Sequence, residues 1–305
     1  MINKPTSDSS QFYVHGLMML AIILAASSFP VGALITNELP ASVLMFFRFL
    51  LASFLFLPFV IRRHGFAFPS VNALWRYAAL GVPLAAFFWC MFESLRFTSV
   101  VNTGALYTLV PAFTAIAAYF INKEITKFFR IVGLIIGTMG ALWVVFRGDI
   151  NLLLGLHLNY GDLVFILGCI SLSLYNPMIK RLHCGEPMMV LTYWVLVSGS
   201  VWLFLLSITS FAQIDWSQIN NSVYLGTLYL AIFSTQITFF IINFSTLKIG
   251  ATKVAAYGFL TPFFVIIMSL IMGLDDFNSV LLPGILLILV SMIFIQIDMP
   301  DKSNA

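Results

Sequence analysis

The sequence predicts an all-α integral membrane protein with ten transmembrane helices, and two observations lead to this prediction. Between Val14 and Ile297 the chain is a succession of apolar stretches, each about 20 residues long, which is what a helix needs to cross a bilayer core of ~30 Å. Composition agrees, because 61% of the residues are hydrophobic and only 9% are charged, whereas soluble domains carry roughly 25% charged residues. A chain of this kind cannot cover a water-exposed surface with polar groups.

The apolar stretches are predicted to be helices, because only helices and closed barrels satisfy backbone polar groups in lipid. Barrel strands alternate in polarity, and runs such as Val280–Val290 do not. The expected spans are residues 14–36, 41–61, 74–95, 101–121, 128–147, 160–180, 188–209, 222–244, 252–273 and 279–297.

Lysine and arginine residues predict the orientation, because cytoplasmic loops are enriched in them. With the N-terminus inside, Arg96 and Arg147 lie in outer loops and Arg48 lies within a span. All the other basic residues fall on the cytoplasmic side: Lys4, Arg62, Arg63, Arg76, Lys123, Lys127, Arg130, Lys180, Arg181, Lys248, Lys253 and Lys302. We therefore expect a multi-pass protein of the plasma membrane, as in a bacterial inner membrane, with residues 1–13 and 298–305 as cytoplasmic tails.

The chain also repeats itself, which divides it into residues 14–147 and 160–297. Gly104–Pro111 lines up with Ala255–Pro262, and Gly133, Glu124, Pro30 and Pro40 line up with Gly284, Asp275, Pro177 and Pro187. Each half holds five helices, an odd number, so the second half is expected to be inverted relative to the first. Inverted repeats are common in secondary transporters, where they surround a substrate site near the middle of the membrane.

From about Gly16 to Ile297, the sequence resembles the EamA type of the drug/metabolite transporter superfamily. The residues that carry the resemblance are Pro40 and Arg48 in the second span, and Gly104, Pro111, Glu124 and Gly133 in and after the fourth. The resemblance implies ATP-independent movement of amino acids, nucleotides or other small metabolites, often outward. It also implies that the first, third, fourth, sixth, eighth and ninth helices surround the cavity.

The second half departs from the family pattern at two positions. Val195 stands where the repeat of Arg48 would be, and Asp275 with Asp276 replaces a single glutamate. Strict symmetry between the two ends of the cavity is therefore not expected.

Charged residues within spans are functional candidates, since they are rare in lipid. Glu93 is the only acidic residue clearly inside a span, and it shares a helix face with Trp89 and Arg96. Glu93 could pair with Arg48 or carry a proton that couples transport to a gradient. The alternative is that Glu93 and Arg96 only reach the headgroups by snorkelling.

Polar residues beside prolines predict the cavity lining, because a proline frees a carbonyl one turn earlier and broken helices line transporter cavities. Uncharged amides are also expected to face inward, since burying them against lipid is costly. Helix–helix packing and hydrogen bonding remain the alternative role for all of these residues. The candidates are Asn102, Thr103, Tyr107, Tyr175, Asn176, Gln236, Asn243, Tyr257 and Thr261, with Pro30, Pro111, Pro177 and Pro262 as hinges.

Glu124 and Asp275 follow the fourth and ninth spans. Each could cap the next helix, where the helix dipole favours an acid, or form a gating ion pair. The three cysteines and four histidines show no metal-ligand spacing, so neither a metal nor a cofactor is expected.

These observations favour a secondary transporter that exports small metabolites such as amino acids by alternating access. A drug or cation exporter, a membrane-embedded enzyme acting on lipid-linked substrates, and a channel are the alternatives. The expected partners are a small-molecule substrate and the bilayer, without nucleic acid. Proton coupling and a homodimer are left open.

Overall fold

The computed structural model describes residues 8–125, 128–146, 148–149, 158–274 and 279–296, and all regular structure within these ranges is helical. The helices are α1 (Asp8–Ala26), α2 (Ser28–Ile35), α3 (Ala41–His64), α4 (Val71–Ser94), α5 (Val100–Leu106), α6 (Val110–Asn122), α7 (Phe128–Val145), α9 (Tyr160–Leu182), α10 (Met188–Phe211), α11 (Asn221–Tyr229), α12 (Thr238–Ile249), α13 (Ala251–Ala256), α14 (Thr261–Ile271) and α15 (Leu282–Gln296).

Eight helical stretches of the described chain are long and apolar enough to cross a membrane. They are Phe12–Ile35, Ala41–His64, Val71–Ser94, Val100–Asn122, Tyr160–Leu182, Met188–Phe211, Asn221–Ile249 and Lys253–Ile271. Two further apolar helices, Phe128–Val144 and Ser279–Ser291, are shorter. Within the described residues the predicted ranges therefore fall on helical stretches, and eight of these stretches meet the length of a full span.

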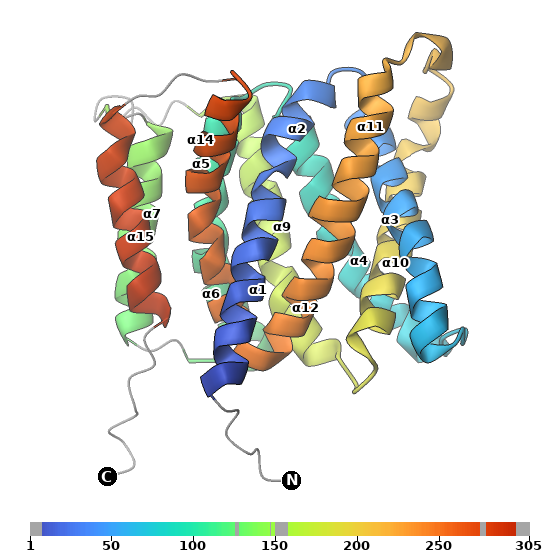
Figure 1. Cartoon of the computed structure of the whole chain (residues 1–305), viewed down its shortest axis with the longest axis horizontal. Coiled ribbons are helices and arrows are strands. Elements are labelled where there is room, and N and C mark those ends of the chain that lie inside the picture. Colours follow the sequence, from blue (N-terminus) through green and yellow to red (C-terminus); the bar gives the residue numbers. More distant parts are fainter. Residues whose placement is uncertain (1–7, 126–127, 147, 150–157, 275–278, 297–305) are drawn as a thin grey trace.

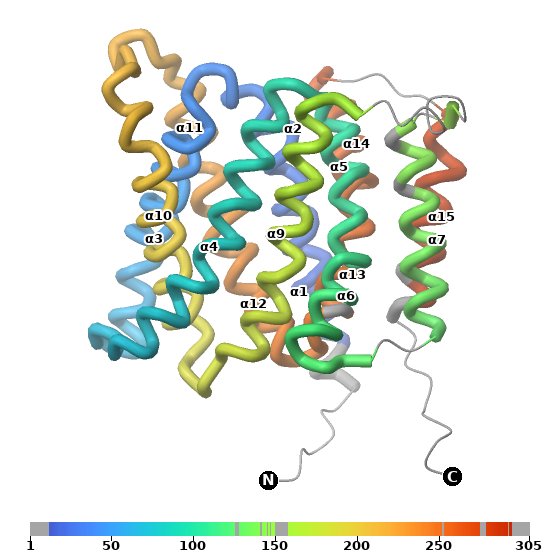
Figure 2. Tube along the Cα trace, turned by 180° about the vertical axis from the view of Figure 1, so that it is seen from behind, coloured from blue at the N-terminus to red at the C-terminus, as the bar shows by residue number. Residues whose placement is uncertain are grey.

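The helices stand side by side in one bundle (Figure 1), with α7 and α15 at one edge and α3 with α10 at the other. Seen from behind, α4, α9 and α6 run between these two edges (Figure 2). α1 begins and α15 ends at the same end of the bundle, the lower end in Figure 1. Basic residues occupy the last turns of α3, α9 and α12 at that same end, which we call the basic end.

Four of the membrane-length stretches change helix type or break along their length. A single residue, Ser27, separates α1 from α2, and Pro30 lies in the first turn of α2. Tight 3-10 turns at Tyr107–Leu109 and Tyr257–Leu260 precede α6 and α14, each of which carries a proline in its first turn. A π-helical segment, Leu230–Ile237, separates α11 from α12. By contrast, α9 continues through Pro177.

The edge pair α7 and α15 is joined by close backbone contact at two glycines. A Cβ atom on Gly140 would come within 2.7 Å of the carbonyl oxygen of Gly284, and a Cβ on Gly284 would come equally close to the carbonyl of Gly140. Small residues allow helix backbones in membranes to approach in this way. The two short apolar helices therefore form one packed unit beside the rest of the bundle.

Candidate functional site

A cavity lies among helices from both halves of the chain. Its walls come from α1, α2, α4, the turn between α5 and α6, α9, the π-helical segment, α12, α13 and the turn that follows. The walls are mainly apolar, with aromatic rings from Phe29, Phe87, Phe88, Tyr107, Tyr175 and Phe239 and further polar groups from Ser28, Asn176, Ser234 and Thr238. About 50 Å³ is open to the centre of a water molecule, and each water needs about 10–15 Å³. A larger guest therefore requires the walls to move.

Three of the residues predicted from sequence line this cavity: Tyr107, Tyr175 and Asn176. The ring of Tyr107 meets Phe29 at a centroid distance of 5.8 Å and Phe87 at 5.9 Å. Tyr175 is 1% exposed, and its ring packs edge-on against Phe239 at 5.8 Å. Tyr107 belongs to one of the tight turns before a proline, so the expected link between broken helix and cavity wall holds here.

The other predicted lining residues lie behind or away from the wall. Trp89 is half-buried and packs against the apolar core, and Asn102 donates to Thr98 Oγ1 at 3.4 Å. Thr103 is fully buried and donates to the carbonyl of Val100 in its own helix at 2.9 Å. Gln236 and Thr261 are also buried, and Thr261 Oγ1 has no hydrogen-bond partner.

Arg48 is completely buried, although it belongs to α3 in the middle of an apolar span. Its Nε donates to Thr235 Oγ1 at 2.6 Å, and its Nη2 donates to Ser28 Oγ at 3.2 Å and to the carbonyl of Ser234 at 3.3 Å. The guanidinium carbon lies 4.3 Å from the centroid of the Phe88 ring. The sequence predicted a functional role for Arg48 but gave no sign of these partners.

The π-helical segment supplies two of the groups that Arg48 contacts. π-helical turns are rare and occur frequently at functional sites. Ser234 and Thr235 both belong to this segment, and Ser234 Oγ in turn donates to the carbonyl of Leu24 in α1 at 2.6 Å. The segment therefore links α1 and α3 at the side of the cavity.

Glu93 does not pair with Arg48. Its carboxylate lies 3.4 Å from Arg96 Nη1, and 19% of its side chain is exposed. It occupies the last turn of α4 and is not among the cavity-lining residues of the described chain. The pairing of Glu93 with Arg48, one of the possibilities that the sequence left open, is thus replaced by a local ion pair.

Three further hydrogen bonds connect helices around the cavity. Asn243 in α12 is fully buried, accepts a hydrogen bond from the Tyr175 hydroxyl at 3.1 Å and donates to Thr192 Oγ1 in α10 at 2.8 Å. Tyr257, in the turn before α14, hydrogen-bonds through its hydroxyl to Nδ1 of His15 in α1. Neither Asn243 nor Tyr257 lines the cavity, but each holds elements that do.

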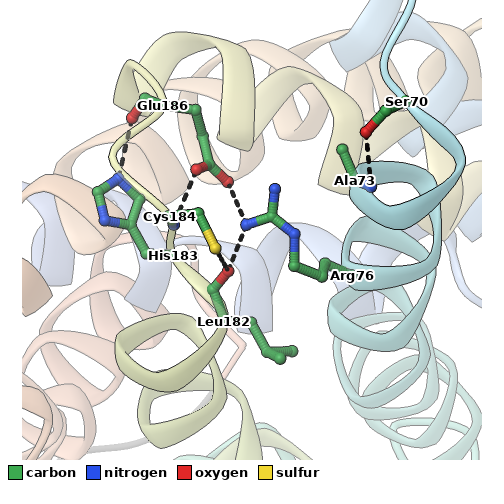
Figure 3. Close-up of polar contacts among 7 residues, drawn as sticks. All are labelled: Ser70, Ala73, Arg76, Leu182, His183, Cys184 and Glu186. Carbon is green, nitrogen blue, oxygen red and sulfur yellow. Dashed lines mark hydrogen bonds and ion pairs between the residues drawn. The ribbon is translucent and has the colours of Figure 1, made fainter.

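At the basic end, ion pairs tie α4 and α6 to the end of α9. Lys180 Nζ lies 2.7 Å from Glu124 Oε1, which favours the ion-pair role for Glu124. Figure 3 shows Arg76 donating to the carbonyl of Leu182 at 2.6 Å and to Glu186 Oε1 at 3.2 Å. The second gating candidate, Asp275, lies outside the described residues.

The sequence did not predict several of the residues that line the cavity. Phe29, Phe87, Phe88 and Phe239 provide most of the aromatic wall, yet phenylalanine is frequent along the whole chain, with 31 residues. Nothing in the sequence separates those that face a cavity from those that face lipid. Ser234 is the exception, because it is a polar residue close to Gln236 on the same span and could have been predicted on that basis.

The fold and this cavity define a multi-pass helical membrane protein with an internal, largely aromatic chamber. The EamA-like transporter family matches residues 13–146 and again residues 159–297. The chain therefore belongs to the EamA-like transporter family.

Two relatives and one solved structure are similar to this chain over most of its length. It is 28% identical over 199 residues to the uncharacterized transporter YyaM of Bacillus subtilis, and the match spans 65% of each chain, just under two thirds of that relative. It is 24% identical to an uncharacterized transporter of Archaeoglobus fulgidus, over 84% of this chain and 87% of the other. A solved crystal structure superposes with a TM-score of 0.72 at 16% identity, covering 95% of this chain and 98% of the other. The last comparison shows a shared fold.

Proposed function

We propose that the protein is a secondary active transporter that moves small metabolites, such as amino acids, outward across the plasma membrane by alternating access. The observation that carries this proposal is the position of the cavity. Its walls come from α1, α2, α4 and the α5–α6 turn, within the first family-matched segment, and from α9, α12 and α13, within the second. A chamber between two segments can open to either side when one segment moves against the other.

The proposal includes ten spans arranged as two inverted repeats, residues 14–147 and 160–297. It is supported by the two family matches, which cover nearly these ranges, and by the matching tight turns before Pro111 and Pro262. In this arrangement α7 and α15 cross as a pair of short helices. Pro30, Pro111 and Pro262, each beside a break or a tight turn, serve as the hinges about which the helices bend, whereas α9 is unbroken at Pro177.

The basic end faces the cytoplasm in this proposal, which places both termini there. The last turns of α3, α9 and α12, with their lysine and arginine residues, support this orientation. A reporter enzyme that is active only in the cytosol, fused after Ala305, should be active in cells. Activity of a periplasm-specific reporter at the same position would reverse the orientation and leave the transport proposal unchanged.

We propose that a proton gradient supplies the energy for transport. The exposed edge formed by α7 and α15 would allow two copies of the chain to pack as a homodimer. A drug or cation exporter is the second candidate, favoured by the aromatic walls. It is the weaker one, because no Asp or Glu is among the cavity-lining residues of the described chain, and a carboxylate is the usual partner of a desolvated cation.

Counterflow in proteoliposomes tests the proposal. Vesicles containing the full-length protein are preloaded with unlabelled amino acids, nucleosides or organic cations, and uptake of the labelled solute is followed with and without a pH gradient. A carrier should give transient, saturable accumulation of one class of solute. Flux that never saturates would indicate a channel. The absence of any flux would contradict the carrier proposal and favour a membrane-embedded enzyme.

A further inference from the structure

Arg48 is a buried cation without an anionic partner in the described part of the chain. It is 0% exposed, and none of the ion pairs among the described residues includes it. Within the same residues its Nη1 has no hydrogen-bond partner, whereas Nε and Nη2 are both bonded. A buried charge is costly unless it is paired and fully hydrogen-bonded. The site around Arg48 is therefore incomplete without a further group that carries negative charge.

The guanidinium lies directly behind the cavity wall. Of the three groups to which it donates, Ser28 Oγ and the Ser234 carbonyl belong to residues that line the cavity. The aromatic ring against which it packs, Phe88, is also a lining residue. Ser28, Ser234 and Phe88 therefore contact Arg48 and also form part of the cavity wall.

The contact with Phe88 leaves one donor of the guanidinium available for a carboxylate. The guanidinium carbon lies over the Phe88 ring, 4.3 Å from its centroid, and Nη1 has no hydrogen-bond partner among the described residues. Arginine and carboxylate groups form paired, parallel hydrogen bonds that are shorter and stronger than neutral ones. The unbonded Nη1 offers a donor for such a pair.

A second incomplete polar group faces the same cavity from the opposite half of the chain. Asn176 in α9 is a lining residue, and its side-chain oxygen is buried without a hydrogen-bond partner. An amide oxygen accepts from an ammonium or another N–H group. The mainly aromatic cavity therefore has an unpaired acceptor on its wall and an unpaired cationic donor buried directly behind that wall.

We propose that Arg48 recognises the carboxylate of the transported solute and Asn176 its ammonium group, so that the solute is a small amino acid with an apolar or aromatic side chain. This assignment rests on the proposed transport function and names the substrate class of the same cavity. In the solute-free state Ser28, Ser234 and Thr235 hold Arg48 in place. When the solute binds, its carboxylate supplies the missing negative charge.

Competition in counterflow tests the carboxylate requirement with compounds that differ only in that group. In proteoliposomes of the full-length protein, phenylalanine is compared with its primary amide and with phenethylamine, and leucine with leucinamide and isopentylamine. The acid should compete about 10- to 100-fold better than the amide or amine, the range expected for hydrogen bonds to a charged group. Equal competition by the amides, or exchange of nucleosides or cations only, would contradict the assignment of Arg48 to a carboxylate. Either result would leave the proposed transport function intact. Absence of all exchange would instead overturn the carrier proposal itself.

Variants test the two residues separately. Arg48→Gln should remove the preference for acid over amide, and Arg48→Lys should retain part of it. Arg63→Gln, an exposed arginine near the end of the same helix, is the matched control and should behave as wild type. A folded Arg48→Gln protein that keeps the full preference would contradict the assignment. If Arg48→Gln fails to fold, the assignment is judged from two other measurements. These are the preference for acid over amide in Arg48→Lys and the same preference in the wild type.

Asn176→Leu should weaken competition by phenylalanine about 10-fold, because the ammonium loses its acceptor. Competition by 3-phenylpropionate, which has the same ring and carboxylate but no ammonium, should change little. Equal weakening of both compounds would show that Asn176 shapes the cavity without recognising the ammonium.

Discussion

The hydroxyl of Tyr175 donates a hydrogen bond to the buried amide oxygen of Asn243 at 3.1 Å, and the nitrogen of that amide donates to Thr192 at 2.8 Å. This chain of two hydrogen bonds connects α9, α12 and α10. The Tyr175 ring forms part of the cavity wall. The position of that wall therefore depends on an amide that no solute needs to touch.

Replacing Asn243 with Leu should destabilise the protein more than replacing Tyr175 with Phe. Asn243→Leu leaves both the Tyr175 and the Thr192 hydroxyl without their present partner, whereas Tyr175→Phe leaves only one acceptor unpaired. We expect about 1–3 kcal/mol for Asn243→Leu and about 1 kcal/mol for Tyr175→Phe, measured by thermal unfolding of the detergent-purified protein. An effect of Asn243→Leu no larger than that of Tyr175→Phe would show that the amide does not connect the three helices.

The ion pair between Glu124 and Lys180 should restrain the basic end of the cavity. Removing it with Glu124→Gln costs about 0.2–1 kcal/mol for a partly exposed pair, and so should make opening at this end roughly 1.5- to 5-fold more frequent. The measurement is the rate at which a membrane-impermeant thiol reagent, applied from the basic end, modifies Asn176→Cys on the cavity wall. The exposed native thiol is removed with Cys184→Ser, since Cys90 and Cys169 are buried.

The control for this experiment is Glu38→Gln, an exposed acid in the connection between α2 and α3. It should leave the modification rate at Asn176→Cys unchanged. If Glu124→Gln also leaves the rate unchanged, the pair only caps the helix ends and does not restrain opening.

The contact between α7 and α15 should tolerate no side chain at Gly284. A Cβ there would come within 2.7 Å of the Gly140 carbonyl and 2.8 Å of a Val144 methyl group. Gly284→Ala should therefore cost about 1–3 kcal/mol by overpacking, seen as a lower unfolding temperature. Because neither helix lines the cavity in the described chain, the relative affinities for different solutes should not change. Gly16→Ala, where nothing lies within 4 Å, is the control and should be neutral.

Glu93→Gln separates a coupling role from a structural one. The carboxylate is paired with Arg96 at 3.4 Å, is partly exposed and does not line the cavity. We therefore expect both solute exchange and accumulation driven by a pH gradient to persist in Glu93→Gln proteoliposomes. Loss of gradient-driven accumulation with exchange intact would assign the coupling proton to Glu93 despite its position.

Helix positions could be predicted from the sequence because length and hydropathy determine which segments can lie in a bilayer. The range expected as 160–180 is α9, Tyr160–Leu182, and that expected as 41–61 is α3, Ala41–His64. The π-helical segment at Leu230–Ile237 was not predicted. It depends on tertiary contacts such as those of Thr235 with Arg48, which leave no periodic pattern in the sequence.

The cavity was only partly predictable, for a physical reason that differs between residues. Tyr107 could be found because a nearby proline marks the broken helix that faces the cavity. Phe88 could not, because a phenylalanine facing the cavity and one facing lipid have the same local sequence properties. Glu93 was a candidate because it is a charge within a span, but its partner is Arg96, three residues further along the chain and just beyond the end of α4.

If the cavity between the two halves is the path of the solute, a bulky side chain placed inside it should block transport. Ala25 lines the cavity from α1, whereas Ala212 is exposed just after α10. Counterflow is measured in proteoliposomes of the wild type, Ala25→Trp and Ala212→Trp, each first shown to be folded and monodisperse. We expect saturable exchange for the wild type and Ala212→Trp, and its loss in Ala25→Trp. Full exchange by a folded Ala25→Trp protein would show that the solute does not pass through this cavity.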